Sequence, residues 1–432
     1  RHAARHTMIA ANVLPRVLHG SSGKPLTLAQ HEEAFATTAR ATSLFEELEA
    51  SGLTGRGGAA FPTARKVRLI REQRGHHKVV VVNAMEGEPA SHKEFSLMGA
   101  NPHLVLDGAQ FLASMVGAQE IAVCVARDNP AVVNHLNQAI HERGRLGLRE
   151  VPIVLHTPPW RYVAGEESAL IHWLNDNESL PQYRSTRPHV LRVGRAAVLV
   201  DNAETCANVA LIGRFGSHWF RGLGSAANPG TTLVSLTGAV AQPTVLEASL
   251  GTPLRTLLSA GHAESDPQAL LLGGFGGSWL DGAHLDVGYD NESLAPFNVS
   301  VGAGVVVVLP RDACGVAETQ RVVKWMANES ARQCGPCAFG LPALAEDLTE
   351  ITRGSSEARD AHRRLQVRCD MIAGRGACHH PDGVVRLVRS ALVVFAGDVD
   401  DHVNGAPCLG ALSARRYVPV PSLEHEDELI WQ

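Results

Sequence analysis

The sequence predicts an α/β fold in the first half of the chain, then a small α+β unit, then a unit made of helices alone. Between residues 77 and 176, strand-like and helix-like stretches alternate, which is typical of a mainly parallel sheet covered by helices. Strand-like stretches around a single helical stretch fill residues 231–310, and only helical stretches follow residue 312. We therefore expect domains at residues 1–225, 226–310 and 311–432.

The alternation in the first half rests on apolar segments separated by amphipathic ones. Strands are expected at residues 77–84, 120–126 and 151–157, and helices at 104–118, from Pro130 to about 144, and at 166–176. Pro130 suits the first turn of a helix, where its missing N–H needs no partner. The late helices are expected near 313–330, 339–352, 357–373 and 383–403. Packed together, they would form a bundle.

Composition limits the class of protein. Of 432 residues, 45% are hydrophobic and 19% are charged, which is typical of a soluble globular protein. The net charge of −5 is well mixed and argues against nucleic-acid binding. No apolar run approaches the ~18 residues of a membrane span, and the N-terminal stretch lacks the apolar region of a secretory signal. We expect a cytoplasmic protein that does not insert into a membrane.

A glycine-rich stretch, GLTGRGGAAFPTARK at residues 52–66, is the first candidate for a ligand site. Its glycines would let backbone N–H groups approach a phosphate closely. Lys66 would add a positive charge, and Phe61 a flat face for a planar ring. The stretch matches neither the G-x-G-x-x-G nor the P-loop spacing, so a turn that needs glycine for geometry alone remains an alternative. A second stretch, GGFGGSWLDG at 273–282, is interpreted as hairpin turns.

Three further stretches place polar side chains where strands end and helices begin. They are VNAMEGEPASHKEF (82–95), RYVAGEESAL (161–170) and LVDNAETCANVALI (199–212). Ligands of α/β proteins bind at the carboxyl ends of strands, where carboxylates can accept hydrogen bonds from ribose hydroxyls or flavin N–H groups. Carboxylates at a helix N-terminus are also favoured by the helix dipole. Each stretch alone is therefore better explained by helix capping.

The cysteines point to a metal or redox site. Five of the eight lie between residue 334 and the C-terminus, which is not the pattern of a disulfide scaffold. Cys334 and Cys337 form a Cys-Gly-Pro-Cys motif, but a helical stretch precedes it, whereas a thioredoxin-like dithiol follows a strand. An iron–sulfur cluster or a zinc site needs more ligands. Cys378, followed by His379 and His380, lies about one helical hairpin further on.

Taken in order, these stretches resemble the NADH-oxidising flavoprotein subunit of respiratory complex I, a module also found in NAD-linked hydrogenases and formate dehydrogenases. The resemblance extends from about residue 50 to about residue 405. The glycine-rich stretch GRGGAAFPTARKV resembles the family's GRGGAGFPTGLKW, and the acidic turn NAMEGEPASHKE resembles its NADEGEPGTFKD. The stretch YVAGEESAL resembles the family's YxxGEETAL, and DNAET resembles its NNVET. The cysteine motif ESARQCGPC resembles the family's ESCGxCxPC. Because separated motifs recur in one order, the resemblance is specific.

The resemblance implies an α/β domain that binds FMN and NADH in one pocket, a β-grasp domain of the SLBB type, and a helical bundle that holds one [4Fe–4S] cluster. The residues it implies for FMN are Gly55, Gly57, Lys66, Asn83, Glu86, Tyr162, Glu166, Asn202 and Thr205. Those it implies for NADH are Gly58, Phe61, Glu88 and Glu167. Arg56, Gly165 and Asp201 complete the cofactor-binding set, and the implied cluster ligands are Cys334, Cys337 and Cys378.

The sequence departs from the family at positions that matter for these cofactors. Met85 replaces an aspartate of the FMN turn, Asp201 replaces an asparagine, and Val67 replaces a tryptophan. The family's Lys-Pro-Pro-Phe, which helps to hold NADH, is poorly matched in RSTRPHV at residues 184–190. Ala331 stands where the first cluster cysteine is expected.

The fourth cluster ligand is therefore open. The candidates are His379 or His380, Cys408, Cys369 and a non-protein ligand. Since clusters of this type normally take four thiolates, two alternatives remain for the cysteines. One is a zinc site that adds a histidine, and the other is an empty, degenerate site.

The resemblance implies an NADH:acceptor oxidoreductase, in which a hydride passes from NADH to FMN and single electrons then pass through the cluster to a partner, or the same path in reverse. The partner would be a ferredoxin or another electron-transfer protein, and the chain could be a subunit of a larger redox complex. We expect no catalytic side chain, because FMN carries the chemistry, with Glu88 and Glu167 supporting NADH. The alternatives are a non-catalytic paralogue that serves as an assembly or binding subunit, and an FMN enzyme that reduces a small organic substrate.

Overall fold

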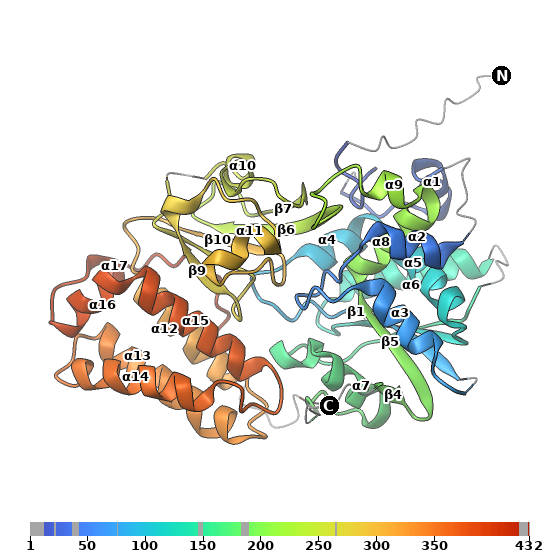
Figure 1. The fold of residues 1–432 in the computed structure, drawn as a ribbon. Coiled ribbons are helices and arrows are strands. Elements are labelled where there is room, and N and C mark those ends of the chain that lie inside the picture. Colours follow the sequence, from blue (N-terminus) through green and yellow to red (C-terminus); the bar gives the residue numbers. More distant parts are fainter. Residues whose placement is uncertain are drawn as a thin grey trace.

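The computed structural model describes residues 13–20, 23–36, 43–75, 77–145, 150–182, 190–263, 266–422 and 431. These residues form two five-stranded sheets and a group of C-terminal helices (Figure 1). Most of the stretch RSTRPHV, where the resemblance places an NADH contact, lies outside the described residues. None of the described helices has the length and apolar character needed to cross a membrane.

The first sheet has the strand order β3-β2-β1-β5-β4. Its strands are β1 (Lys78–Ala84), β2 (Glu120–Val125), β3 (Ile153–His156), β4 (Arg192–Val193) and β5 (Ala196–Asn202). The pairs β1–β2, β1–β5 and β2–β3 are parallel, and β4 is antiparallel to β5. The register places Asn83 opposite Asn202. The carboxyl ends of β1 and β5 therefore lie side by side, where open α/β sheets bind ligands.

Helices accompany this sheet, as the sequence predicts. They are α1 (Leu28–Ala34), α2 (Leu44–Ser51), α3 (Thr63–Arg71), α4 (Lys93–Ala100), α5 (Pro102–Val116), α6 (Pro130–Arg145), α7 (Glu167–Asp176), α8 (Ala203–Phe215) and α9 (Ser217–Phe220). The valines of β1 alternate between two hydrophobic cores, because successive side chains of a strand point to opposite faces. Helices α5 and α8 pack so closely that a Cβ at Gly108 would lie 1.7 Å from the carbonyl oxygen of Cys206.

The second sheet has the strand order β7-β6-β10-β8-β9. Its strands are β6 (Thr231–Gly238), β7 (Thr244–Ser249), β8 (Ala269–Leu272), β9 (Ser278–Asp281) and β10 (Val305–Leu309). Strands β6 and β10 are parallel, and the other pairs are antiparallel. Helix α10 (Leu254–Ala260) corresponds to the predicted helix, whereas α11 (Asn291–Leu294) was not expected, because so short a helix leaves no periodic pattern.

The C-terminal part is helical, as predicted, with a π-helical turn, η4 (Pro336–Gly340), before α13. Its helices are α12 (Gly315–Asn328), α13 (Leu341–Thr352), α14 (Ala358–Ile372), α15 (His380–Val394), α16 (Ala396–Val403) and α17 (Leu409–Leu412). The single helix expected at 383–403 is wrong, because two helices meet at Phe395. The Phe395 ring is buried edge-on against Trp279, with 5.1 Å between centroids. Tertiary packing thus overrides the local helical pattern.

A single hydrophobic core extends from the second sheet into the C-terminal helices. It includes Leu271 of β8, Val306 of β10, Leu344 of α13 and Val388 of α15. The boundary expected at residue 310 therefore falls within a continuous core, and this sheet and these helices pack against each other directly.

Candidate functional site

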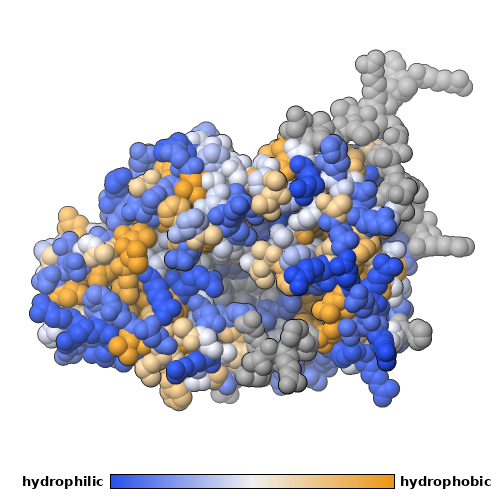
Figure 2. Space-filling model, viewed as in Figure 1, coloured by the Kyte–Doolittle hydropathy of each residue, from blue (hydrophilic) through white to orange (hydrophobic). Residues whose placement is uncertain are grey.

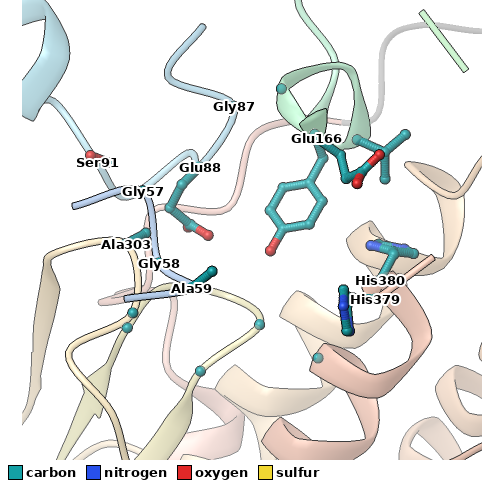
Figure 3. A pocket seen from close by; sticks show the side chains of 18 of the residues that line it. Gly57, Gly58, Ala59, Gly87, Glu88, Ser91, Glu166, Ala303, His379 and His380 are labelled. Atoms are coloured by element: carbon teal, nitrogen blue, oxygen red, sulfur yellow. The ribbon is translucent and has the colours of Figure 1, made fainter. Parts of the chain in front are cut away.

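A cavity of about 670 Å³ lies where both sheets and the C-terminal helices meet (Figure 3). Its walls come from the glycine-rich loop before α3, the turn after β1, the chain before α7, the β8–β9 turn and the start of α15. The face shown in Figure 2 is hollowed near the middle of the molecule. The predicted residues that line the cavity are Gly57, Gly58, Asn83, Glu86, Glu88, Tyr162, Gly165, Glu166, Asn202 and Cys378.

The glycine-rich loop forms one wall of the cavity. The Gly55 N–H donates to the Phe61 carbonyl oxygen at 2.9 Å and closes the loop at its base. Gly58 has a φ of +106°, a conformation that favours glycine, and it faces the backbone of Gly302. The loop therefore presents bare backbone to the cavity, while the Phe61 ring is 44% exposed and lies outside it.

Arg56 and Thr205 anchor this loop and do not line the cavity. The buried Arg56 guanidinium donates to the carbonyl oxygens of Thr231 at 3.1 Å and Pro229 at 3.2 Å. Burial lowers the pKa of Arg56, and Glu204 opposes that effect. The Arg56 N–H donates to Thr205 Oγ1 at 2.9 Å. Both side chains thus act on the cavity through the position of the loop.

Lys93 is the buried cation of the cavity wall. Its Nζ donates to Glu204 Oε2 at 2.6 Å and to the Arg56 carbonyl oxygen at 2.6 Å, and it lies 3.2 Å from Glu94 Oε1. Burial alone would lower the pKa of Lys93, but Glu204 and Glu94 raise it. Glu86, also buried beside this group, has its pKa raised well above the ordinary value by burial and by Glu94. The wall is therefore a compact network of ionisable groups around the Lys93 ammonium.

Glu88 projects from the turn after β1 and is held by the β8–β9 turn. Its Oε2 accepts from the Phe275 N–H at 2.9 Å, and Tyr162 also forms a hydrogen bond with it. Gly274 has a φ of +90°, and a Cβ there would lie 2.4 Å from Glu88 Oε2. The interpretation of 273–282 as hairpin turns thus fits β8 and β9, but it missed that Gly273, Gly276 and Gly277 also line the cavity.

We expect Glu88 to make the stability of the ligand-free chain depend on pH. Burial raises the pKa of Glu88 from 4.5 to about 7, so between these values the unfolded chain loses this proton while the folded chain keeps it. Stability therefore falls as pH rises through this window, by about 2 kcal/mol between pH 5.5 and 8 at 1.36 kcal/mol per pH unit. Between pH 5.5 and pH 8, the urea midpoint of Glu88→Gln should fall less than that of the unmodified chain. Parallel pH profiles for the two proteins would contradict this assignment.

Tyr162 and His380 both line the cavity and pack edge to face, with 5.4 Å between ring centroids. His380 Nε2 lies 2.9 Å from the Met326 carbonyl oxygen, and burial lowers the pKa of His380 to about 4. A neutral ring that donates through Nε2 keeps a lone pair on Nδ1. This Nδ1 is buried and has no hydrogen-bond partner among the described residues. Figure 3 places His379 and His380 on the side of the cavity opposite Glu88.

Three of the lining residues also cap or brace local structure. Glu166 caps α7 by accepting from the Ser168 N–H at 3.0 Å, and Asn202 Oδ1 caps α8 by accepting from the Thr205 N–H at 3.0 Å. Asn83 Nδ2 donates to the Gly165 carbonyl oxygen at 2.8 Å. Helix capping therefore explains why polar residues stand at Glu166 and Asn202, as the sequence indicates. The same hydrogen bonds fix the orientation of these side chains at the cavity.

Lys66, Glu167 and Asp201 form a separate group beside the cavity rather than lining it. Lys66 Nζ donates to Glu167 Oε1 at 2.7 Å and lies 3.7 Å from Asp201 Oδ1. Burial raises the pKa of Asp201 to about 6, although Lys66 opposes it. Asp201 Oδ2 is buried without a hydrogen-bond partner among the described residues. The substitution at position 201 has thus left a buried acidic oxygen with unused hydrogen-bonding capacity.

Cys334, Cys337 and Cys378 come together beside the cavity. Cys337 is buried at η4 and forms a hydrogen bond with Cys334. Burial is the largest cause that raises the pKa of Cys337, and the thiols of Cys334 and Cys378 raise it further. Cys378 lines the cavity and accepts a hydrogen bond from the His380 backbone. The three side chains thus converge beside the cavity and supply three thiols for a metal group.

The structure reduces the candidates for the fourth cluster ligand. Cys408 lies with Cys314 and His402. Cys369 is buried in α14, where the charged groups that act on its pKa are Arg389 and Asp370 and none of the thiols of Cys334, Cys337 and Cys378. His379, His380 and a non-protein ligand remain.

Comparisons with known proteins identify the family. Residues 48–211 match the Nuo51 FMN-binding domain, and residues 317–402 match the NADH-ubiquinone oxidoreductase-F iron-sulfur binding region. An NADH-quinone oxidoreductase subunit from Rhizobium meliloti is 30% identical, over 84% of this chain and 90% of the relative. The corresponding subunit from Mycobacterium tuberculosis is 33% identical, over 83% of this chain and 84% of the relative. The chain belongs to the NADH-binding flavoprotein subunit family.

The solved structures agree with this membership of the NADH-binding flavoprotein family. An NAD⁺-reducing [NiFe]-hydrogenase in the H₂-reduced state is similar with a TM-score of 0.77 and 26% identity, over 83% of this chain. The match covers 62% of the length of the hydrogenase chain. The predicted family is confirmed, and so are FMN, NADH and a [4Fe–4S] cluster as the cofactors that the two family models support.

The residues of this flavoprotein subunit fit FMN, NADH and a [4Fe–4S] cluster. The cavity volume of about 670 Å³ is within the range of small-molecule sites. Its glycine walls leave room for a planar ring, and the unpartnered His380 Nδ1 offers a hydrogen-bond acceptor. Cys334, Cys337 and Cys378 lie within the iron–sulfur region and supply ligands of the type that iron–sulfur clusters require.

Proposed function

We propose that this chain oxidises NADH in the described cavity and delivers the electrons singly through the cysteine site to another protein. One observation carries the proposal: Cys378 lines the cavity and also lies with Cys334 and Cys337. A hydride site and a one-electron site would therefore be adjacent. The family match supports this activity and gives no support to a non-catalytic paralogue or an enzyme for small organic substrates.

When bound, FMN supplies hydride acceptance and one-electron release, and the cluster supplies one-electron transfer. The chain's own residues bind and orient. Gly57 and Gly58 would let a ring lie against the loop backbone, while Glu166 and Asn202, fixed as caps, would present hydrogen-bonding atoms of fixed direction. Glu88, on the opposite wall from His380, would meet the nicotinamide nucleotide.

The residue assignments from the family resemblance remain part of this proposal. The lining residues would contact the flavin ring and the nicotinamide. Lys66, Glu167 and Asp201, with Gly55 and Phe61, lie just outside the cavity and would contact the phosphate and ribose groups that extend beyond it. Arg56 and Thr205 would contribute by holding the loop.

The finer fold names belong to the proposal as well. The second sheet, with a parallel central pair and α10, would be the β-grasp domain of the SLBB type at residues 226–310. The helices α12 to α16 would form the cluster-binding bundle of residues 311–432. The α/β unit at residues 1–225 would be the FMN- and NADH-binding domain.

Partners are inferred from the names of relatives. The Rhizobium meliloti relative is named as a subunit of NADH-quinone oxidoreductase. HndC of Solidesulfovibrio fructosivorans, which is 29% identical over 83% of this chain and 75% of the relative, is named as a subunit of an NADP-reducing hydrogenase. We propose that this chain is likewise a subunit of a redox complex, with a ferredoxin or similar electron-transfer protein as acceptor or donor. A cytoplasmic location remains an expectation.

The test is an absorbance titration of anaerobically purified protein with NADH. We expect flavin bands that bleach together with a broad iron–sulfur shoulder, because the cavity and the cysteine site adjoin. Flavin bleaching without the shoulder would contradict the one-electron path. A colourless protein that does not respond to NADH after reconstitution with FMN would contradict the whole proposal.

A further inference from the structure

A second cluster of metal-ligating side chains lies away from the cavity. Cys314, His402 and Cys408 place Sγ, a ring nitrogen and Sγ all within 4.8 Å of one another. Cys314 Sγ is 3.2 Å from His402 Nε2, and both residues are buried, while Cys408 is half-buried. The residues come from the start of α12, the end of α16 and the start of α17, which Figure 1 shows together at one end of the helical part.

The surroundings of these ligand atoms resemble the outer shell of a metal site. Cys314 Sγ accepts from the Ala317 N–H at 3.3 Å, and Cys408 Sγ accepts from the Ala411 N–H at 3.4 Å. His402 also forms a hydrogen bond with the Thr352 backbone, which leaves Nε2 facing the sulfur atoms. Metal-bound histidines usually donate their other ring N–H in this way, and the bond fixes ring and tautomer.

We propose that Cys314, His402 and Cys408 bind a zinc ion. Two thiolates and one imidazole are ligands that suit Zn²⁺ and its tetrahedral geometry. The separations are compatible with about 2.3 Å for zinc–sulfur and about 2.0 Å for zinc–nitrogen bonds. Water would occupy the fourth position on the side where Cys408 reaches the surface. The proposal rests on these residues alone and does not depend on the proposed redox function.

The zinc ion would fasten the C-terminal segment to α12. This segment already lies close to α12: a Cβ at Gly410 would lie 2.7 Å from the Cys314 nitrogen. The backbone N–H groups of Tyr417 and Val418 donate to Glu318 of α12. A metal bridge between Cys314 and Cys408 would add a direct link to the hydrogen bonds and core packing that already join the two segments.

Zinc-edge X-ray absorption on the purified full chain tests the proposal without any mutation, because iron and flavin do not contribute at that edge. We expect about one zinc ion per chain, with two sulfur and one or two nitrogen or oxygen neighbours. Three sulfur neighbours would place zinc at Cys334, Cys337 and Cys378 and contradict the proposal. A chain without zinc, or peptides in which Cys314 and Cys408 form a disulfide, would also contradict it.

Variants provide the second test. Cys408→Ser changes a half-buried residue and should reduce zinc to a small fraction of the unmodified level while iron and FMN content stay unchanged. Cys369→Ser is the control, because Cys369 is a buried cysteine outside both groups, and it should retain zinc. Loss of iron but not zinc from Cys408→Ser would overturn the assignment and return Cys408 to the iron–sulfur cluster.

Discussion

Replacing Cys337 with serine is expected to abolish the iron–sulfur cluster and electron transfer to one-electron acceptors. Cys337 is buried between Cys334 and the cavity-lining Cys378, and the chain has no cysteine at position 331 to compensate. Iron should fall from about four atoms per chain to below about one. Iron and acid-labile sulfide analysis, with low-temperature electron paramagnetic resonance of the reduced protein, would measure the loss.

The Cys337→Ser experiment has an internal control and a clear opposite result. Cys369→Ser removes another buried cysteine, from α14, and should retain iron. FMN content should stay near normal in both variants, because neither residue lines the cavity. Full iron content in Cys337→Ser would show that other residues hold the cluster.

Replacing Lys93 with methionine is expected to destabilise the protein strongly and to release FMN. Lys93 Nζ compensates the buried carboxylates of Glu204 and Glu94, and breaking such a buried pair from one side costs about 3–5 kcal/mol. The same side chain holds the Arg56 carbonyl oxygen of the glycine-rich loop. Urea unfolding followed by circular dichroism, together with flavin retention on a desalting column, would measure both effects.

Lys324→Met is the matched control for Lys93→Met. Lys324 is exposed on α12, so its loss should change the free energy of unfolding by no more than about 0.5 kcal/mol. Adding Glu204→Gln to Lys93→Met should recover part of the lost stability, since it removes the uncompensated charge. A Lys93→Met variant as stable as Lys324→Met would mean that the carboxylates of Glu204 and Glu94 are not ionised in the folded protein.

The parts of the fold with a strong local pattern could be predicted from sequence. The valine run before Asn83 forms β1 between two parallel neighbours, and continuous apolar runs are typical of strands buried on both faces. The late helices follow their apolar periodicity, except where Phe395 inserts against Trp279 and divides one of them. That break depends on a residue more than a hundred positions away, which local periodicity does not register.

The candidate site was predictable only in part, for the same reason. Motifs at strand ends identified Asn83, Glu88 and Asn202, which the sheet register and the following turns bring to one cavity. Glu204 was not identified, because its role depends on Lys93, which lies far from it in sequence but within 2.6 Å in space. The sequence explains Gly274 by turn chemistry alone, since its contact with Glu88 arises from tertiary packing.

The position of the cavity has a consequence for cooperativity. One lobe of the molecule consists of the first sheet and its helices, and the other is the continuous core of the second sheet and the C-terminal helices. A ligand bound between the two lobes would contact both of them. Its binding free energy would therefore stabilise the interface between the lobes as well as each lobe. The flavin-loaded chain should therefore melt in one transition. Without flavin, the two lobes are free to melt in separate steps.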